Sequence, residues 1–475
     1  MKKIIILGAN PVASALAETL ANEKNDITVV DTNSEKLQEL KDRIDIGTII
    51  GQASHPDVLE KAGGEDADMI IAVTDSDEIN MVACRVAYSM FQTQEKICCI
   101  RSSSYLGSEE KLRGKHGIAV DDIVSPEVIV SDYISHLIDL PGSLQVLDFA
   151  KGKVQLVAVK AFYGGPLVGQ EIRMLRQHMP KIETRVAAIF RKDRPIMPEG
   201  LTVIEAEDEV FFVAARENIR ACMRELRRLD KPYKRLIIAG GGNIGLRLAQ
   251  TIEQRYKVKI IESDAKRCAY LSEHLDKAMV LHGEASHPEL LLEENIEDTD
   301  LFVAVSSDDE DNIMSSLLAK RLGAKKVMTV INNAAYVDLV QGGDIDIAIS
   351  PQQATIGRVL THVRRGDVVN VHSLRRGAAE AMEAIVHGDP TSSKVVGRAI
   401  RDISLPEGTT IGAIVRNDEV LIAHDNTVIE SGDHVILFLV DRKSFKEVER
   451  LFLSLIHISE PTRPRLISYA VFCLK

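Results

Sequence analysis

The sequence predicts an α/β protein with two doubly wound parallel sheets of the Rossmann type, each followed by a small β-rich α+β domain. Short apolar runs alternate with helical stretches, as in sheets built from strand–helix–strand units. The tetrapeptide "ASHP" recurs at residues 53 and 285, within longer segments that stay similar at the same offset. Residues 186–215 and 411–440 form a second similar pair. Together these observations indicate a tandem duplication of a two-part module.

The predicted elements follow one another in a regular order. The first α/β unit has strand-like runs at residues 4–8, 26–31, 47–50, 69–73, 97–101 and 118–124. A Ser-Pro pair follows each α/β unit and predicts a linker helix that connects the two parts and could pack on a partner. The β-rich units alternate apolar and polar residues between turns, as antiparallel sheets do. We therefore expect Rossmann domains at 1–124 and 233–349, linker helices at 125–143 and 350–368, and C-terminal domains at 144–228 and 369–452.

Composition excludes several function classes. The 475 residues are 45% hydrophobic and 27% charged, as in soluble globular proteins. The formal charge of -12 argues against nucleic-acid binding and against a polybasic membrane anchor. No apolar run approaches the ~18 residues that a membrane span needs. The six cysteines show no metal-ligand spacing, so we expect a reducing, cytoplasmic location and no metal site.

The second glycine loop carries the strongest functional signal. In "RLIIAGGGNIGLRLAQ", Gly240, Gly242 and Gly245 give a G-x-G-x-x-G pattern between a strand and a helix. Such glycines permit a tight turn, a close approach of backbone to a pyrophosphate and close helix packing. Glu262 ends the next strand, where an acid holds ribose hydroxyls in dinucleotide-binding folds. The sequence therefore predicts a nucleotide site here.

The first loop departs from this pattern. "IIILGANPVASALAETL" keeps Gly8, but Asn10 and Ala13 stand where the other two glycines are expected. Asn10 places a Cβ where backbone should approach the pyrophosphate, and Pro11 has no amide hydrogen. Asp31 is in place for a ribose. We predict a nucleotide loop that binds more weakly than the second one.

Two further duplicated pairs lie near strand ends. Thr74 and Ser306 each follow a strand, at the edge where open α/β sheets bind ligands. Each could contact a nucleotide or cap the next helix, and the pattern leaves both roles open. His55 and His287 of the "ASHP" segments have no second catalytic partner, so we interpret them as loop residues.

The chain resembles a known family over about residues 1–452. Segments that carry the match include "VDTNSEKL", "EINMVACRVAYS", "VKAFYGGPL", "GGGNIG" and "IDIAISPQQATI". They are similar to the tandem RCK proteins (regulators of potassium conductance) that serve as peripheral cytoplasmic subunits of bacterial Trk potassium-uptake systems. The resemblance implies a homotetrameric ring on a membrane-embedded potassium-translocating subunit of the Trk system. It also implies gating by NAD(H) and by ATP or ADP.

The resemblance also marks residues of the nucleotide sites. In the strand "KICCIRS" the family usually has A-R-I-R, so Cys99 replaces the first arginine and Arg101 keeps the second. Losing a cation that could face phosphate adds to the expected weakness of the first site. The predicted cofactor-binding residues are Gly8, Ala9, Asn10, Pro11, Val12, Asp31, Thr74, Asp75, Cys99, Arg101, Gly240, Gly242, Asn243, Ile244, Gly245, Glu262 and Ser306.

A rival interpretation is an NAD-dependent oxidoreductase with duplicated cofactor domains. The β-rich units are small, repeat one another and offer no evident acid–base pair to face a nicotinamide. We therefore expect a regulatory protein without catalytic residues rather than an enzyme. NADH oxidation against a panel of carbonyl substrates discriminates between the two.

The last segment of the chain does not continue the repeat. Residues 453–475 have no counterpart after the first module and mix two prolines with unrelated apolar residues. We interpret this segment as non-native sequence and leave it out of the fold prediction.

Overall fold

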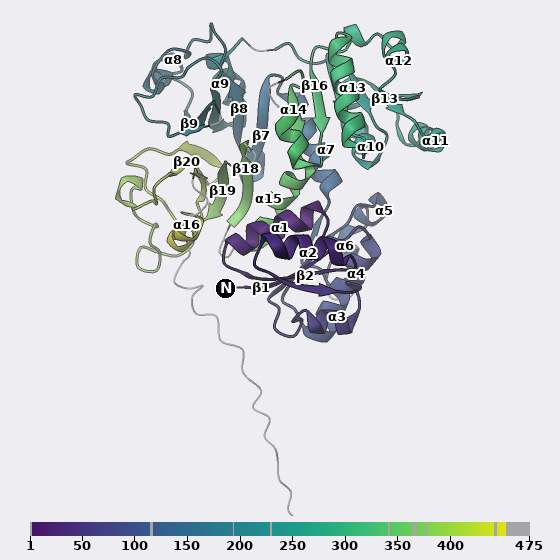
Figure 1. Ribbon diagram of the computed structural model, residues 1–475. Coiled ribbons are helices and arrows are strands. Elements are labelled where there is room, and N and C mark those ends of the chain that lie inside the picture. Colours follow the sequence, from purple (N-terminus) through teal and green to yellow (C-terminus); the bar gives the residue numbers. More distant parts are fainter. Residues whose placement is uncertain are drawn as a thin grey trace, which may run out of the picture.

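The computed structural model describes residues 2–114, 117–192, 194–228, 230–340, 343–363, 368–375, 378–440 and 444–452. These residues form two six-stranded and two five-stranded sheets, arranged as four lobes (Figure 1). The fold class predicted from the sequence is confirmed. Residues 453–475, interpreted above as non-native, lie outside the described part of the chain. Among the described residues, no helix combines the length and apolar character needed to cross a bilayer.

The first Rossmann sheet is parallel and is built from six strands. They are β1 (Lys3–Leu7), β2 (Asp26–Asp31), β3 (Gly47–Ile50), β4 (Met69–Ala72), β5 (Glu95–Cys99) and β6 (Asp122–Val124). Their order is β3-β2-β1-β4-β5-β6. The chain therefore changes direction across the sheet between β1 and β4, where open α/β sheets bind ligands. Runs such as KIIIL in β1 are apolar almost throughout because the strands are covered on both faces.

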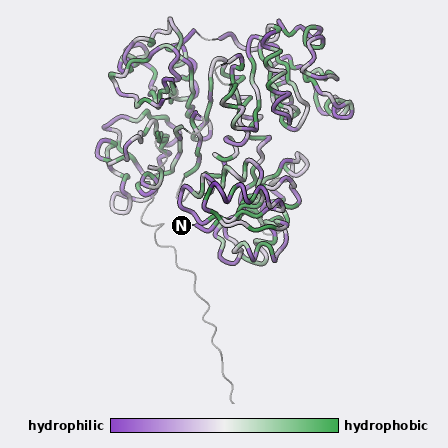
Figure 2. The backbone as a smooth tube through the Cα atoms, viewed as in Figure 1, coloured by the Kyte–Doolittle hydropathy of each residue, from purple (hydrophilic) through white to green (hydrophobic). Residues whose placement is uncertain are grey.

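Helices cover both faces of this sheet. They are α1 (Pro11–Asn22), α2 (Ser34–Arg43), α3 (Pro56–Lys61), α4 (Asp77–Val86), α5 (Ser103–Leu106) and α6 (Glu109–Leu112). Apolar residues of α1 and α2, such as Leu16 and Leu37, pack on one face. Residues of α3 and α4, such as Leu59 and Ala83, pack on the other. Figure 2 shows the resulting pattern, with apolar segments gathered in the strands.

The second Rossmann domain repeats the first. Its strands are β12 (Arg235–Ala239), β13 (Lys257–Glu262), β14 (Met279–His282), β15 (Leu301–Ala304), β16 (Val327–Val330) and β17 (Ile347–Ile349). Its helices are α10 (Asn243–Ile252), α11 (Ala265–His274), α12 (Pro288–Glu293), α13 (Asp309–Arg321) and α14 (Ala334–Val340). The strand order β14-β13-β12-β15-β16-β17 corresponds strand by strand to that of the first sheet.

The two C-terminal domains are antiparallel sheets, as the alternating pattern predicts. The first contains β7 (Ser143–Phe149), β8 (Val154–Lys160), α8 (Leu175–His178), β9 (Thr184–Arg191), β10 (Arg194–Ile196), β11 (Glu209–Ala215) and α9 (Ile219–Leu226). The second contains β18 (Val368–Leu374), β19 (Ala379–Ile385), β20 (Thr409–Arg416), β21 (Glu419–Ile422), β22 (His434–Leu439) and α16 (Phe445–Phe452). The duplication preserves a paired ion contact. Arg191 Nε donates to Asp208 at 2.9 Å, and Arg416 Nε donates to Asp433 at 2.8 Å.

The linker helices cross between the two modules. Helix α7 (Pro126–Asp139) follows the first Rossmann domain but packs on α10 of the second, and Ile134 shares a core with Leu248. Helix α15 (Pro351–Val363) follows the second Rossmann domain but packs on α1 of the first, where Val359 joins the core around Leu16 (Figure 1). The partner of each predicted linker helix is therefore the other module of the same chain.

The two C-terminal sheets also meet face to face. One apolar core contains Phe211 and Phe190 of the first domain together with Phe438 and Ala413 of the second. With the crossed helices, this contact leaves neither module with a complete core of its own. Each half of the chain would expose a large apolar surface if it were separated from the other.

Candidate nucleotide-binding sites

The second glycine loop turns tightly between β12 and α10. Gly240 has a φ of +109°, which side chains rarely adopt, and a Cβ there would come within 2.8 Å of Ser306 N. A Cβ at Gly245 would lie 2.0 Å from the Gly240 carbonyl oxygen. Around Gly242, by contrast, a Cβ would meet no protein atom within 4 Å. The loop is therefore close to its own sheet but open at Gly242.

The start of α10 presents unpaired backbone amides. Glu262 Oε2 accepts a hydrogen bond from Gly241 N at 2.8 Å. Among the described residues, no acceptor pairs with the four amides from Gly242 to Gly245. Free amides at a helix N-terminus, together with the helix dipole, favour an anion. This geometry fits the diphosphate group of NAD(H) or ADP.

Arg267, in the first turn of α11, is a candidate site residue that the sequence analysis missed. Its Nε donates to Gly241 O at 2.6 Å, and its Cζ lies 4.8 Å from the centre of the Tyr270 ring. Its Nη2 is buried and has no hydrogen-bond partner among the described residues. A guanidinium held beside the loop with an unused donor can form a charge-assisted bond to phosphate. The available signal was its position shortly after Glu262, on the helix that follows the strand ending at Glu262.

In the first loop, Asn10 points inward rather than into solvent. The residue is 8% exposed, and its Oδ1 accepts a hydrogen bond from Ala13 N at 3.0 Å, which makes it the N-cap of α1. Its Nδ2 donates to Val73 O at 2.6 Å and to Asp75 Oδ1 at 3.2 Å. The sequence drew attention to the Cβ of Asn10. The structure adds that its amide group holds the loop against the end of β4.

The first loop also offers fewer amides. Ala9 N donates to Asp31 Oδ2 at 2.6 Å, Ala13 N is capped by Asn10, and Pro11 has no amide hydrogen. Among the described residues, the amides of Asn10 and Val12 remain without an acceptor, against four at the second loop. The predicted difference between the two sites thus has a geometric basis, and the affinities themselves stay a prediction.

Thr74 and Ser306 shape the turns that follow β4 and β15. Asn80 Oδ1 accepts hydrogen bonds from Thr74 N at 2.9 Å and from Thr74 Oγ1 at 2.7 Å. Asn312 Oδ1 accepts one from Ser306 N at 2.8 Å. In both modules the N-cap of the next helix is the residue two positions later. Neither Thr74 nor Ser306 therefore caps that helix, which was one of the two roles that the sequence left open. Their contact with a nucleotide stays a prediction.

Cys99 and Arg101 differ in what they can offer a ligand at the first site. The Cys99 side chain is buried in the core beneath α1, and burial raises the pKa of its thiol to about 12, so it is neutral near pH 7. It therefore supplies no charge toward a phosphate. The Arg101 guanidinium lies 3.7 Å from Asp75 and 3.9 Å from Glu127. Since Asp75 also contacts Asn10, Arg101 is the cation that the fold places beside the first loop.

A linker helix of the other module contacts the helix that follows each glycine loop. Gln352 Nε2 of α15 donates to Pro11 O at 2.9 Å, in the first turn of α1. Asp132 of α7 lies 3.6 Å from Arg247 of α10. A ligand that moves either loop would therefore act on a helix of the other module.

The histidines of the "ASHP" segments stand at helix starts. His55 and His287 precede α3 and α12 and make no side-chain cap hydrogen bond. Within the described ranges, no group of three or more His, Cys, Asp or Glu side chains is placed to hold a metal ion.

Two domain families each match this chain twice. The TrkA-N domain matches residues 4–126 and 236–351, and the TrkA-C domain matches residues 156–227 and 389–453. These segments together cover most of the chain. The chain belongs to the TrkA family.

Proteins named Trk system potassium uptake protein TrkA are similar to this chain over nearly its whole length. The Halomonas elongata protein is 64% identical over 450 residues, which are 95% of this chain and 98% of the relative. The Vibrio alginolyticus protein is 60% identical with the same coverage. The Haemophilus influenzae protein is 50% identical, again with the same coverage.

Solved structures show the same tandem fold. The crystal structure of the GsuK RCK domain matches with a TM-score of 0.59 at 17% identity, covering 95% of each chain. The GsuK channel bound to NAD matches with a TM-score of 0.59 at 18% identity, covering 95% of this chain and 79% of that one. At these low sequence identities, the similarity shows a shared fold.

Proposed function

We propose that this TrkA-family chain is the nucleotide-sensing regulatory subunit of a membrane potassium-uptake system. It binds NAD(H) or an adenine nucleotide at its Rossmann loops and controls a membrane-embedded, Trk-type potassium-translocating subunit from the cytoplasmic face of the membrane. The names of its relatives support the system, and the two glycine loops support the ligand. The proposal requires no covalent chemistry.

The contact between Gln352 and Pro11 is the observation that carries this proposal. A nucleotide controls a partner only if its binding energy differs between two conformations. The first loop touches a helix of the second module, and the helix behind the second loop packs on α7 of the first. Ligand contacts at either loop are thus coupled to the relative position of the two modules.

The residues present fit a nucleotide better at the second loop than at the first. At the second loop, the amides from Gly242 to Gly245 and Arg267 would hold the diphosphate, and Glu262 would hold the ribose. At the first loop, Gly8 to Val12, Asp31 and Arg101 would do so with fewer donors. Thr74, Asp75 and Ser306 stand at the strand ends nearby and complete the proposed contacts. We leave Cys99 out because its thiol faces the core.

We further propose a homotetrameric ring, and surface residues support an interface on each Rossmann domain. Val82 on α4 is 50% exposed, and its counterpart Met314 on α13 is 61% exposed. The adjacent tyrosines repeat as well, because Tyr105 donates to Glu78 and Tyr336 donates to Glu310. Apolar residues exposed at the same place in both modules are typical of a repeated contact. Light scattering that shows a monomer at micromolar concentration would contradict this part of the proposal.

The decisive experiment measures rubidium flux into liposomes that contain the membrane subunit. Adding the full chain should make the flux depend on NAD(H), ATP or ADP, and Gly242→Asn should weaken the response to that nucleotide. Flux that is independent of nucleotide with the chain present contradicts the regulatory role. Oxidation of NADH with a carbonyl substrate by the chain alone would favour the oxidoreductase instead.

A further inference from the structure

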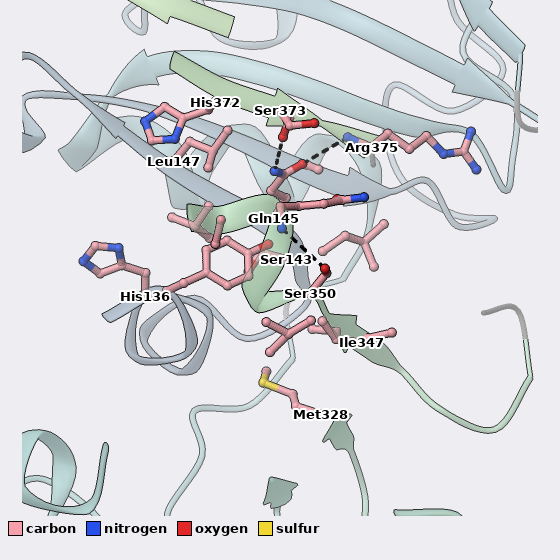
Figure 3. A pocket seen from close by; sticks show the side chains of 18 of the residues that line it. His136, Ser143, Gln145, Leu147, Met328, Ile347, Ser350, His372, Ser373 and Arg375 are labelled. Carbon is pink, nitrogen blue, oxygen red and sulfur yellow. Dashed lines mark hydrogen bonds between the residues drawn. The ribbon is translucent and has the colours of Figure 1, made fainter. Parts of the chain in front are cut away.

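A cavity of about 640 Å³ lies where the two modules meet, away from both nucleotide loops. Its walls come from α7 and β7 of the first module and from β16, β17, α15 and β18 of the second (Figure 3). Cavities of about 300–1,000 Å³ at domain junctions are where proteins hold small molecules. None of the predicted nucleotide-site residues lines it.

The walls of this junction cavity are largely apolar. Leu147, Met328 and Ile347 project into it from three different strands (Figure 3), and the Tyr133 ring of α7 contributes a fourth surface. Phe211 closes the side toward the first C-terminal sheet. An occupant therefore gains most of its binding energy by burying apolar surface.

The charged side chains around the cavity are neutralised by partners within the protein. Lys326 pairs with Asp346 at 2.9 Å, and Arg375 pairs with Glu209 at 3.0 Å. His136 lies 3.5 Å from Asp148. A charged occupant would have to compete with these pairs and lose its own hydration. The cavity therefore favours an uncharged molecule.

Two uncharged side chains of the wall each have a polar atom without a hydrogen-bond partner among the described residues. The buried His372 Nε2 has none. The His372 ring hydrogen-bonds the backbone of Asp148, and burial lowers its pKa to about 4, so it is neutral near pH 7. With the other ring nitrogen used, Nε2 is a hydrogen-bond acceptor. The Tyr133 hydroxyl likewise makes no hydrogen bond, and burial raises its pKa.

We propose that the junction cavity binds an uncharged, mainly apolar molecule, the size of an aromatic bicycle or larger, that donates an N–H or O–H group to His372 Nε2. A buried acceptor without a partner is costly, and such a donor relieves the cost. Because the walls belong to both modules, the occupant stabilises the arrangement of modules seen here over one in which they separate. The site thus adds a second input, separate from the nucleotide loops but acting on the same linker helices.

Indole and benzofuran test this proposal on the full chain. The two probes have nearly the same shape, but only indole donates a hydrogen bond. Calorimetry and saturation-transfer NMR should show saturable binding of both, with indole about tenfold tighter, the effect of one hydrogen bond to a buried neutral acceptor. In His372→Phe, indole should fall to the affinity of benzofuran. His424→Phe, at an exposed histidine of the same domain, should leave both unchanged.

Filling the cavity provides the second arm. Ala354→Trp on α15 should abolish binding of both probes while the circular dichroism and melting temperature stay native. If Ala354→Trp is unfolded, Ile347→Trp is used in its place. Absence of saturable binding to the unmodified chain overturns the proposal, as does a preference for indole that survives in His372→Phe. Probe binding that persists in folded, filled variants also overturns it, because the probes then bind elsewhere.

Discussion

His362 Nε2 lies 2.7 Å from Asp122 Oδ2, which joins the linker helix of the second module to the last strand of the first Rossmann sheet. The Asp122 side chain is 3% exposed and lies 3.3 Å from Arg358 on the same helix. The contact with His362 is an ion pair when the imidazole ring is protonated. At the equivalent positions of the other crossing stand Ile347, Tyr133 and Leu137, so this ionic contact is not repeated there.

Asp122→Asn should loosen the ionic crossing. The substitution removes a buried charge that Arg358 and His362 of α15 face, and we expect local opening of α15 to become easier by about 2 kcal/mol. Native-state hydrogen exchange of α15 measures this, since a single unfolding free energy is ill-defined for several domains. Asp132→Asn is the matched control: its pair with Arg247 is half exposed, and less than about 1 kcal/mol is expected. Equal effects from the two variants would contradict the assignment.

The ionic crossing should also depend on pH. Burial acts to raise the pKa of Asp122, but the contacts with His362, Arg358 and Arg113 outweigh it and hold the pKa below its ordinary value. A lowered pKa means that the stabilisation is present above the unfolded value of about 3.9 and is lost as pH falls through the folded value. The difference between the unmodified chain and Asp122→Asn at pH 5 should therefore shrink on acidification. A stability difference that grows on acidification would contradict the lowered pKa of Asp122.

The second nucleotide loop should bind more tightly than the first. Gly242→Asn should lower affinity at the second site by about one to two decades, as expected for a lost charge-assisted hydrogen bond. Since a Cβ at Gly242 meets no protein atom within 4 Å, the fold should survive. Asn10→Gly with Pro11→Gln should strengthen the first site, and Asn10→Ser with Pro11→Gln is a control that keeps an N-cap.

Calorimetry with NADH and ADP must use the full chain, because the crossed helices give each half an incomplete core. Combining Gly242→Asn with either first-site variant separates the two binding steps. If the unmodified first site already binds as tightly as the second, the number of free amides in each loop does not set the affinity.

Arg267→Gln should weaken binding at the second site by about tenfold. It removes the cation whose buried Nη2 is free to face a phosphate, while the glycine loop stays intact. Lys266→Gln, at the exposed neighbouring position, removes the same charge and should have little effect. The same calorimetric titration compares them, and equal losses would show that Arg267 acts only through net charge.

Deleting residues 453–475 should leave the melting temperature and nucleotide affinity unchanged. The last described helix already completes a core, because Phe445, Val448 and Phe452 pack with the second C-terminal sheet. Differential scanning calorimetry checks this. A fall of several degrees would mean that the tail contributes to the core and is not extraneous.

Much of the fold is encoded locally and could be predicted. The strand at residues 26–31 and the starts of α7 and α15 were predicted at the observed positions, because alternation, turns and Ser-Pro caps depend on neighbouring residues. The last strand of the first sheet was predicted to begin at 118 but begins at Asp122. Apolar content alone does not fix where ladder hydrogen bonds begin.

The candidate site was predictable where glycines mark it and less so where side chains do. Gly240 and Gly245 are required by contacts of 2.8 and 2.0 Å, and the motif predicted them. The inward orientation of Asn10 and the approach of Arg267 to Gly241 were not predictable. Both depend on rotamers and on neighbours that are distant in the sequence.

The sequence by itself determined the duplication, the order of strands and helices, and the chemistry of the two loops, since these follow from periodicity and local turn geometry. The tertiary structure alone decided that the linker helices cross. A helix with an apolar face specifies that it must be buried, but not on which of two similar Rossmann domains. That choice rests on contacts such as Asp122 with His362 and Ile134 with Leu248, which join residues more than a hundred positions apart. It is also the choice that places the helix after each glycine loop against the other module.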